Sequence, residues 1–390
     1  MIGFVGAGIS IEAVTYGLAR YVYGLFLPQI QSDLALTTQL MGMIASTSYI
    51  GYLLATIIGT YITAITGPRF PIMLGGFAAT IGMGLIAFSH SGWVLAIGVF
   101  IAGASPRFSY PPISDAIVQT IASPDRSRIY SFINIGTSYG IILAGPIALL
   151  SGDNWRLSWF IFSALALIAT VWNFFQMPHR RKATAQDANA QDAFKTKISF
   201  DCYMQPRARA LFLAAIMLGI LTSVYWTFSV DLISTVGNIS KYDASTFWIL
   251  TGISGIAGGY AGHLVKYFGL RRVFRLCVLT LSAAVAALAI FYAQLPMVFI
   301  SGALFGAGFI TITALLGIWS VYVFNDHPSA GFGITFFLIS LGQFIGPIFA
   351  GFVGAEYGLP LLFLLTALSC TALIAFAPSY DVRSMTPDGG

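Results

Sequence analysis

The polar stretch PHRRKATAQDANAQDAFKTKISFDCYMQPRAR, residues 178–209, separates two long apolar regions. On either side of it, the chain consists of apolar segments about 20 residues long, which is the length that an α-helix needs to cross a bilayer. We therefore interpret residues 178–208 as a linker between two membrane-embedded halves, residues 1–177 and 209–390.

The two halves repeat each other at a nearly constant offset. The motif Gly-Pro-Arg at 67–69 has a counterpart, Gly-Leu-Arg, at 269–271, which is 202 residues later. The pair Gly145-Pro146 returns as Gly346-Pro347, which is 201 residues later. An internal repeat of this length predicts two halves of the same architecture.

The composition excludes an ordinary soluble domain. Of the 390 residues, 57% are hydrophobic and 8% are charged, whereas about a quarter of the residues in soluble domains are charged. Cys202, Cys277 and Cys370 lack metal-ligand spacing. The sequence also lacks a phosphate-binding loop, a nucleophile elbow and an HExxH motif. We expect neither an enzyme nor a bound metal or cofactor.

Twelve apolar segments are long enough to span a membrane, six in each half. The expected spans are residues 3–27, 38–62, 70–89, 92–118, 128–150, 156–177, 209–236, 244–266, 272–292, 296–323, 329–353 and 359–378. The expected fold is an all-α membrane protein of twelve helices.

The basic residues predict the orientation in the membrane. If the N-terminus is cytoplasmic, 15 of the 19 Lys and Arg residues lie on the cytoplasmic side, and the outer connections hold only Arg156 and Lys241. This bias predicts an inner, or plasma, membrane protein with both termini in the cytoplasm. Because the basic residues are spread over several loops, no nucleic acid partner is expected.

The twelve helices, the linker after the sixth and the repeated halves resemble the major facilitator superfamily. The loop after the eighth segment matches that family's loop signature at Gly262, Leu264, Gly269, Arg271 and Arg272. The acidic position of the signature is occupied by Lys266. The resemblance implies alternating access and a central cavity lined by helices 1, 4, 7 and 10.

The Gly145-Pro146 and Gly346-Pro347 pairs resemble the helix 5 signature of antiporters in that family. Glycine lets helices approach closely, and proline removes a backbone hydrogen bond, so these pairs are candidates for helix packing and gating. The same pairs also suit a tightly packed, kinked helix in a transporter of either direction, and both interpretations remain open.

Ionisable side chains within the spans are the candidates for function, because burying them in a membrane is costly. Glu12, Tyr16 and Arg20 recur at four-residue steps in the first span, which places them on one helical face, toward the bundle interior. The fourth span carries Arg107 and Asp115, with Tyr110 between them.

Two interpretations of these charges remain open. Arg20 and Arg107 could bind a carboxylate through paired hydrogen bonds, with Tyr16 and Tyr110 beside them. Alternatively, the arginines form ion pairs with Glu12 or Asp115 that hold the first and fourth helices together.

Proton coupling requires a buried carboxyl group that binds and releases a proton near neutral pH. Glu12 and Asp115 are the candidates for this role. We expect Asp231, near the outer end of the seventh span, to be a solvated rim residue.

Tyr225, Trp226 and Trp319 lie in the seventh and tenth spans, which the resemblance places along the cavity. They are candidates for holding the apolar body of a substrate, although aromatic side chains in helices also serve simply for packing.

The sequence thus predicts a monomeric, proton-coupled secondary transporter of a small amphipathic organic anion. Its expected partners are that solute, protons and the lipid bilayer. One alternative is a polyspecific drug exporter that exchanges protons for hydrophobic compounds. A second alternative is a membrane receptor or scaffold that does not transport.

Overall fold

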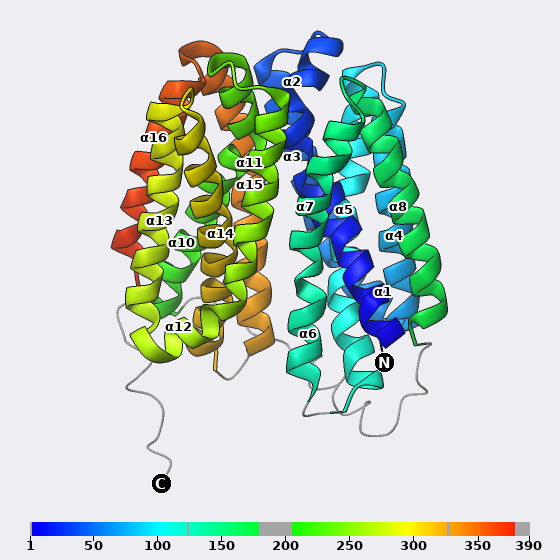
Figure 1. The fold of residues 1–390 in the computed structure, drawn as a ribbon. Coiled ribbons are helices and arrows are strands. Elements are labelled where there is room, and N and C mark those ends of the chain that lie inside the picture. The colour runs from blue at the N-terminus through cyan, green and yellow to red at the C-terminus, as the bar shows by residue number, and fades with distance from the viewer. Residues whose placement is uncertain (1, 123–124, 179–204, 326–327, 379–390) are drawn as a thin grey trace.

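The computed structural model describes residues 2–122, 125–178, 205–325 and 328–378. Within these ranges the chain is almost wholly helical and contains no β-strand. The helices form two bundles that stand side by side, one from each half of the sequence (Figure 1). The predicted all-α fold of two halves is confirmed, and nearly all of the predicted linker, 178–208, lies outside the described residues.

The elements follow the order of the apolar segments. The N-terminal half contains α1 (Ile2–Glu12), η1 (Ala13–Tyr21), α2 (Tyr23–Asp33), α3 (Thr38–Thr66), α4 (Arg69–Ala87), α5 (Gly92–Thr120), α6 (Arg126–Asn134), α7 (Gly136–Leu150) and α8 (Trp155–Gln176). The C-terminal half contains α10 (Pro206–Asp231), η4 (Leu232–Val236), α11 (Lys241–Gly255), η5 (Ile256–Tyr260), α12 (Ala261–Phe268), α13 (Leu270–Phe291), α14 (Leu295–Val323), α15 (Pro328–Tyr357), α16 (Leu359–Ala372) and η6 (Leu373–Phe376).

Twelve membrane passages account for these elements. In the described residues, 11 helical segments are long and apolar enough to span a membrane. The remaining passage is α11, η5 and α12 in succession, in which a 3₁₀ segment divides the helix into shorter pieces. The first passage is longer than predicted, because the helix continues through Pro28 to Asp33. One proline removes only one backbone hydrogen bond, and here it does not end the helix.

The internal repeat is visible in the backbone. Gly67 ends α3 with φ of 76°, and Gly269 ends α12 with φ of 82°. Such positive φ values are easily reached only by glycine. The two loops that the sequence comparison paired therefore make the same kind of turn into the next helix.

The first passage is not a regular α-helix. It changes to a π-helix, η1, directly after Glu12 and returns to an α-helix at Tyr23. Gly17 of η1 and Gly140 of α7 face each other so closely that a Cβ on either would clash with the other's backbone. π-helical segments are rare and frequently lie at functional sites. Arg20 lies in the last turn of this segment.

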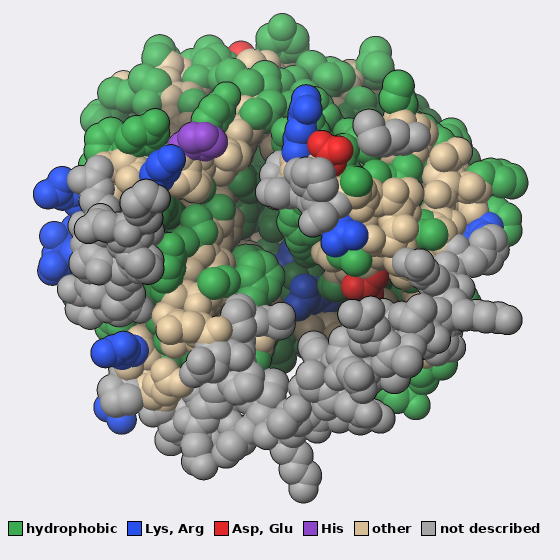
Figure 2. All heavy atoms as spheres, turned by 90° about the horizontal axis from the view of Figure 1, so that it is seen from below, with side chains coloured by type: hydrophobic (Ala, Val, Ile, Leu, Met, Phe, Trp, Pro, Cys, Tyr) green, Lys and Arg blue, Asp and Glu red, His purple; other side chains and the backbone are tan. Residues whose placement is uncertain are grey.

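The two halves meet at one end of the molecule and separate at the other. We call the end at which α1 begins and α8 ends the base, and the opposite end the top; the base is the lower end in Figure 1. The contacts between the halves pair α3 with α15, α7 with α11 and α2 with α10. Seen from the base, the molecule is hollowed between the halves, and Lys or Arg side chains lie within the hollow (Figure 2).

The Gly-Pro pairs lie at or near these contacts. A Cβ on Gly42 of α3 would clash with the carbonyl oxygen of Pro347, and one on Gly145 would clash with Ile249 of α11. Gly346 instead packs against α10 of its own half, at Ile220. The packing role predicted for Gly145, Gly346 and Pro347 therefore agrees with their positions, and the gating role of these residues and Pro146 stays a prediction.

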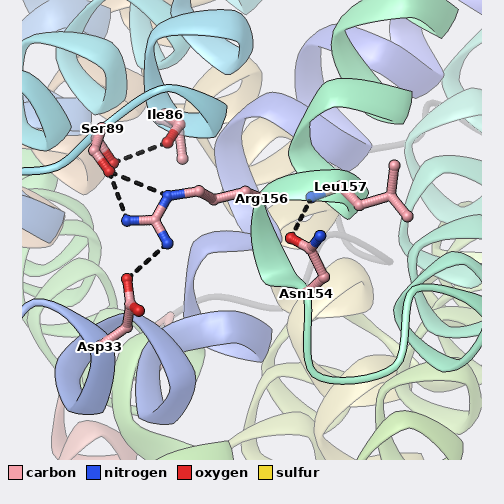
Figure 3. Close-up of polar contacts among 6 residues, drawn as sticks. All are labelled: Asp33, Ile86, Ser89, Asn154, Arg156 and Leu157. Atoms are coloured by element: carbon pink, nitrogen blue, oxygen red, sulfur yellow. Dashed lines mark hydrogen bonds and ion pairs between the residues drawn. The ribbon is translucent and has the colours of Figure 1, made fainter.

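Charged side chains connect the elements at the top of the molecule. Arg156 at the start of α8 pairs with Asp33 at the end of α2, with Nη1 2.6 Å from Oδ2 (Figure 3). It also donates to the carbonyl oxygen of Ser89, between α4 and α5, at 2.8 Å from Nη2. Across the halves, Lys241 Nζ lies 3.7 Å from Asp153 Oδ1.

Candidate functional site

Arg20 lies where the two halves meet. Its side chain is buried, with 6% of the residue exposed. Nη2 donates a hydrogen bond of 2.7 Å to Oε1 of Gln343 on α15, which is also buried. A residue of the first passage thus bonds directly to the opposite half.

Tyrosine rings surround the Arg20 guanidinium. Its Cζ atom lies 3.7 Å from the centre of the Tyr52 ring and 5.3 Å from that of Tyr49, both on α3. The rings of Tyr16 and Tyr21 lie at 5.7 Å. A cation over an aromatic face is attracted by the negative face of the ring, so this cage stabilises the charge without neutralising it.

The second arginine lies beside the same cage. Arg107 of α5 is half-buried, and its Nε donates to Thr56 Oγ1 at 2.8 Å. Its Cζ lies 5.2 Å from the centre of the Tyr52 ring. The two arginines predicted to act together therefore share Tyr52, which the sequence analysis did not single out.

No acidic side chain in the described part of the chain neutralises either arginine. In the described residues, neither Arg20 nor Arg107 forms an ion pair. The alternative in which they bind Glu12 or Asp115 to hold the first and fourth helices together is therefore not supported. Nε and Nη1 of Arg20 also lack a hydrogen-bond partner within this part of the chain.

The tyrosine cage continues from Arg20 toward Glu12. Tyr16 and Tyr52 hydroxyl oxygens lie 3.1 Å apart. The Tyr16 ring packs edge-on against Tyr110 at 5.6 Å between centres, and Tyr110 packs against Tyr130 at 5.5 Å. Tyr16 and Tyr110 are thus brought together with Arg20 as predicted, and Tyr130 extends the row.

The two candidate proton carriers differ in environment. Glu12 is fully buried, and neither carboxyl oxygen has a hydrogen-bond partner among the described residues. Asp115 of α5 is exposed. Asp231, expected at a solvated rim, is instead buried, because α10 packs into the contact between the halves.

The three C-terminal aromatic candidates lie in different places. Trp226 of α10 packs against Tyr21 across the halves, with ring centres 4.7 Å apart. Tyr225 stacks on Phe305 within its own half, at 3.7 Å between centres. Its hydroxyl lies 2.7 Å from Ser301 Oγ. Side chains of adjacent residues on a helix point in different directions, which is why only Trp226 reaches the N-terminal half.

Trp319 of α14 is also directed into the C-terminal half. It packs edge-on against Phe274 of α13, with ring centres 5.6 Å apart. The geometry therefore places neither Tyr225 nor Trp319 beside Arg20. Within the described residues, no group of three or more His, Cys, Asp or Glu side chains is arranged to hold a metal ion.

The sequence model of the Major Facilitator Superfamily matches residues 9–261. A hexuronate transporter of Bacillus subtilis is 23% identical, over 97% of this chain and 93% of its own. The quinolone resistance protein NorA of Staphylococcus aureus is 22% identical over 83% of each chain. Among solved structures, a bacterial homologue of the human lysosomal transporter Spinster superposes with a TM-score of 0.79, at 14% identity, over 95% of each chain.

Proposed function

The chain belongs to the major facilitator superfamily, and from this premise we propose that it transports a small organic anion across the membrane by alternating access. The halves would rock about a site at the level of Arg20, so that the site opens to one side at a time. The hollow at the base and the close contacts at the top correspond to a state open at the base.

The observation that carries this proposal is the buried, unneutralised guanidinium of Arg20. Arginine does not lose its proton in proteins, and an uncompensated buried charge costs several kcal/mol, roughly 3–5 when a partner is removed. A carboxylate from a solute would supply the missing negative charge. Nε and Nη1 have no partner among the described residues, and a carboxylate oxygen can accept a hydrogen bond from either of them.

The surroundings suit a solute that is only partly polar. Tyrosine rings offer apolar faces and hydroxyl groups at the same time, and Trp226 adds an apolar wall from the other half. Arg107 lies next to the same ring, Tyr52, and can attract the anion into the site. The hexuronate named for the Bacillus subtilis relative is a carboxylate, which supports the substrate class.

Glu12 is the better candidate for coupling to protons. A carboxyl group buried without hydrogen-bond donors is less costly to keep neutral than charged. Movement of the halves that brings water to Glu12 would let it release its proton. The exposed position of Asp115 provides no such change of environment.

The distribution of basic residues supports placing the base in the cytoplasm. On that assignment the structure corresponds to an inward-open state. A transporter in this state would receive or release its solute on the cytoplasmic side.

Uptake into proteoliposomes tests the proposal. Radiolabelled monocarboxylates and sugar acids are offered to the wild-type protein, to Arg20→Ala and to Arg275→Ala, which removes an exposed arginine outside the site. We expect saturable uptake by the wild type and by Arg275→Ala, and background uptake by Arg20→Ala. Equal uptake by all three would rule out Arg20 as the anion-binding group.

A second candidate function is export of hydrophobic drugs. The similarity to NorA and the aromatic rings around the site favour it, whereas two arginines would repel a cationic drug. Cells that overproduce the protein would then tolerate cationic dyes, and Glu12→Gln would remove that tolerance.

A further inference from the structure

A small chamber lies beside Arg20, where the break in the first helix meets α3, α8 and α10. It leaves about 10 Å³ for the centre of a water-sized guest, which is room for one such guest. Tyr16, Tyr52 and Arg107 are not among the residues that line it. Arg20, Tyr21 and Tyr49 border both the chamber and the tyrosine cage described above, so the chamber adjoins the cage.

Several residues that line the chamber carry a hydrogen-bond donor with no partner among the described residues. Four of its residues carry buried N–H or O–H groups without a partner among the described residues, at Nε and Nη1 of Arg20, Oγ of Ser48 and Nε1 of Trp159 and Trp226. The guanidinium and indole nitrogens can only donate, and a hydroxyl group can donate as well. None of the residues that line the chamber is an Asp or a Glu.

From this arrangement we infer that the chamber binds one small inorganic anion of the halide class. A halide accepts hydrogen bonds from all sides and neutralises the charge of Arg20. A water molecule can accept only two hydrogen bonds and leaves that charge in place. Because a buried cation is costly without a counter-charge, donors around an arginine favour the anion over water.

The anion would hold the two halves together. Arg20, Ser48 and Trp159 belong to the N-terminal half, whereas Trp226 belongs to the C-terminal half. A ligand bound by groups from both halves stabilises the conformation in which those groups are close. Halide binding therefore favours the state open at the base. The halide would use the same N–H groups of Arg20 that we propose for the organic anion, so the two ligands would compete for Arg20.

Bromide is the probe, because it both binds as a halide and quenches tryptophan fluorescence on contact. The purified protein is titrated by replacing sodium methanesulfonate with sodium bromide at constant ionic strength. The fluorescence and the melting temperature are then recorded. We expect quenching that reaches a plateau and a melting temperature that rises over the same concentrations, since a ligand of the folded state stabilises it by mass action.

Matched variants test whether bromide binds in the chamber. Ser48→Ala removes a hydroxyl that lines the chamber, and Ser46→Ala removes another buried, unpartnered hydroxyl of α3 that does not. We expect bromide to bind about fivefold more weakly to Ser48→Ala, the effect of one hydrogen bond, and unchanged to Ser46→Ala. Trp226→Phe should lose the share of the saturable quenching that Trp226 contributes beside Trp159, whereas Trp93→Phe, which removes an exposed tryptophan, should keep all of it.

Arg20→Gln should abolish the plateau in the bromide quenching curve. If Arg20→Gln does not fold, the comparison of Ser48→Ala with Ser46→Ala tests the inference instead. Quenching that rises linearly with bromide, or that is the same in both serine variants, would overturn the inference. Water alone in the chamber would give that same linear result. If bromide binds but no carboxylate is taken up, halide binding in the chamber is supported and the proposed transport of an organic anion is contradicted. If carboxylates are taken up but bromide does not bind, the proposed transport is supported and halide binding is contradicted.

Discussion

Arg20 in the N-terminal half donates a 2.7 Å hydrogen bond to Gln343 in the C-terminal half, so the proposed anion-binding residue is itself a bond between the two halves. In the alternating-access cycle that we propose, opening at the top would break this bond. A solute that takes over the N–H groups of Arg20 changes the cost of breaking it. On this proposal, occupation of the site is coupled to the relative movement of the halves.

Gln343→Glu should convert this bond into a buried ion pair. Bonds between charged partners are roughly twice as strong as neutral ones, so the carboxylate of the variant would occupy Arg20 and compete with the solute. We expect a higher melting temperature than the wild type, together with uptake reduced by more than about tenfold. Gln343→Met, which removes the acceptor while keeping the length, should not raise the melting temperature. Full uptake by Gln343→Glu would contradict this role.

Glu12→Gln should uncouple transport from protons, because an amide cannot bind and release one. Imposing a pH gradient across proteoliposomes should change the rate of solute uptake by the wild type and leave the rate of Glu12→Gln unchanged. Asp115→Asn provides the comparison, since Asp115 is exposed and should keep the response. If the response disappears in Asp115→Asn and survives in Glu12→Gln, the assignment of the two carboxyl groups is reversed.

Gly42→Ala should disturb the contact between the halves at the top. The new methyl group would clash with the carbonyl oxygen of Pro347, and overpacking of this kind typically costs about 1–3 kcal/mol. We expect a lower melting temperature and a shorter average distance between spin labels placed on either side of the base. Gly262→Ala is the control, because no neighbouring atom lies within 4 Å of its Cβ position. Equal effects of the two substitutions would show that the top contact is not close-packed.

Two basic residues at the top should differ in their contribution to stability. Arg156 pairs with Asp33 at 2.6 Å and also donates to the Ser89 carbonyl oxygen, so Arg156→Ala should cost about 1.5–3 kcal/mol. Lys241 lies 3.7 Å from Asp153, whose side chain is fully exposed. Such exposed pairs contribute only about 0–1 kcal/mol. Thermal unfolding in detergent measures the loss of stability in Arg156→Ala and in Asp153→Asn. A larger loss in Asp153→Asn than in Arg156→Ala would contradict the prediction.

Hydropathy and the repeated glycines were sufficient to predict the fold. Each passage carries its own length and apolar composition, so the twelve helices follow from local sequence. The π-helical segment η1 was not predicted; within it, Gly17 closely approaches Gly140, which is far away in the chain. The same limit applies to Arg20 and Gln343, which are neighbours only because the two halves meet.

Part of the cluster around Arg20 could be predicted from the sequence. Arg20, Arg107, Tyr16 and Tyr110 stood out because ionisable and phenolic groups are costly in a membrane. Tyr52 was missed, although Tyr49, Tyr52 and Thr56 recur at helical spacing on α3 and mark one polar face.

Two of the three aromatic candidates were selected from the sequence but do not lie beside Arg20. Tyr225 and Trp319 pack within the C-terminal half, and Trp226 reaches the other half. The interior of a bundle and the wall of a cavity favour the same residue types, so composition could not separate them.

The most direct test of the account is the binding of carboxylates to the purified protein with and without Arg20. Melting temperatures are measured for the wild type, Arg20→Ala and Arg275→Ala against carboxylates and their neutral amide analogues. The account predicts that a carboxylate raises the melting temperature of the wild type and of Arg275→Ala, that its amide does not, and that Arg20→Ala does not respond. Stabilisation of Arg20→Ala by the same carboxylate, to the same extent as the wild type, would contradict it.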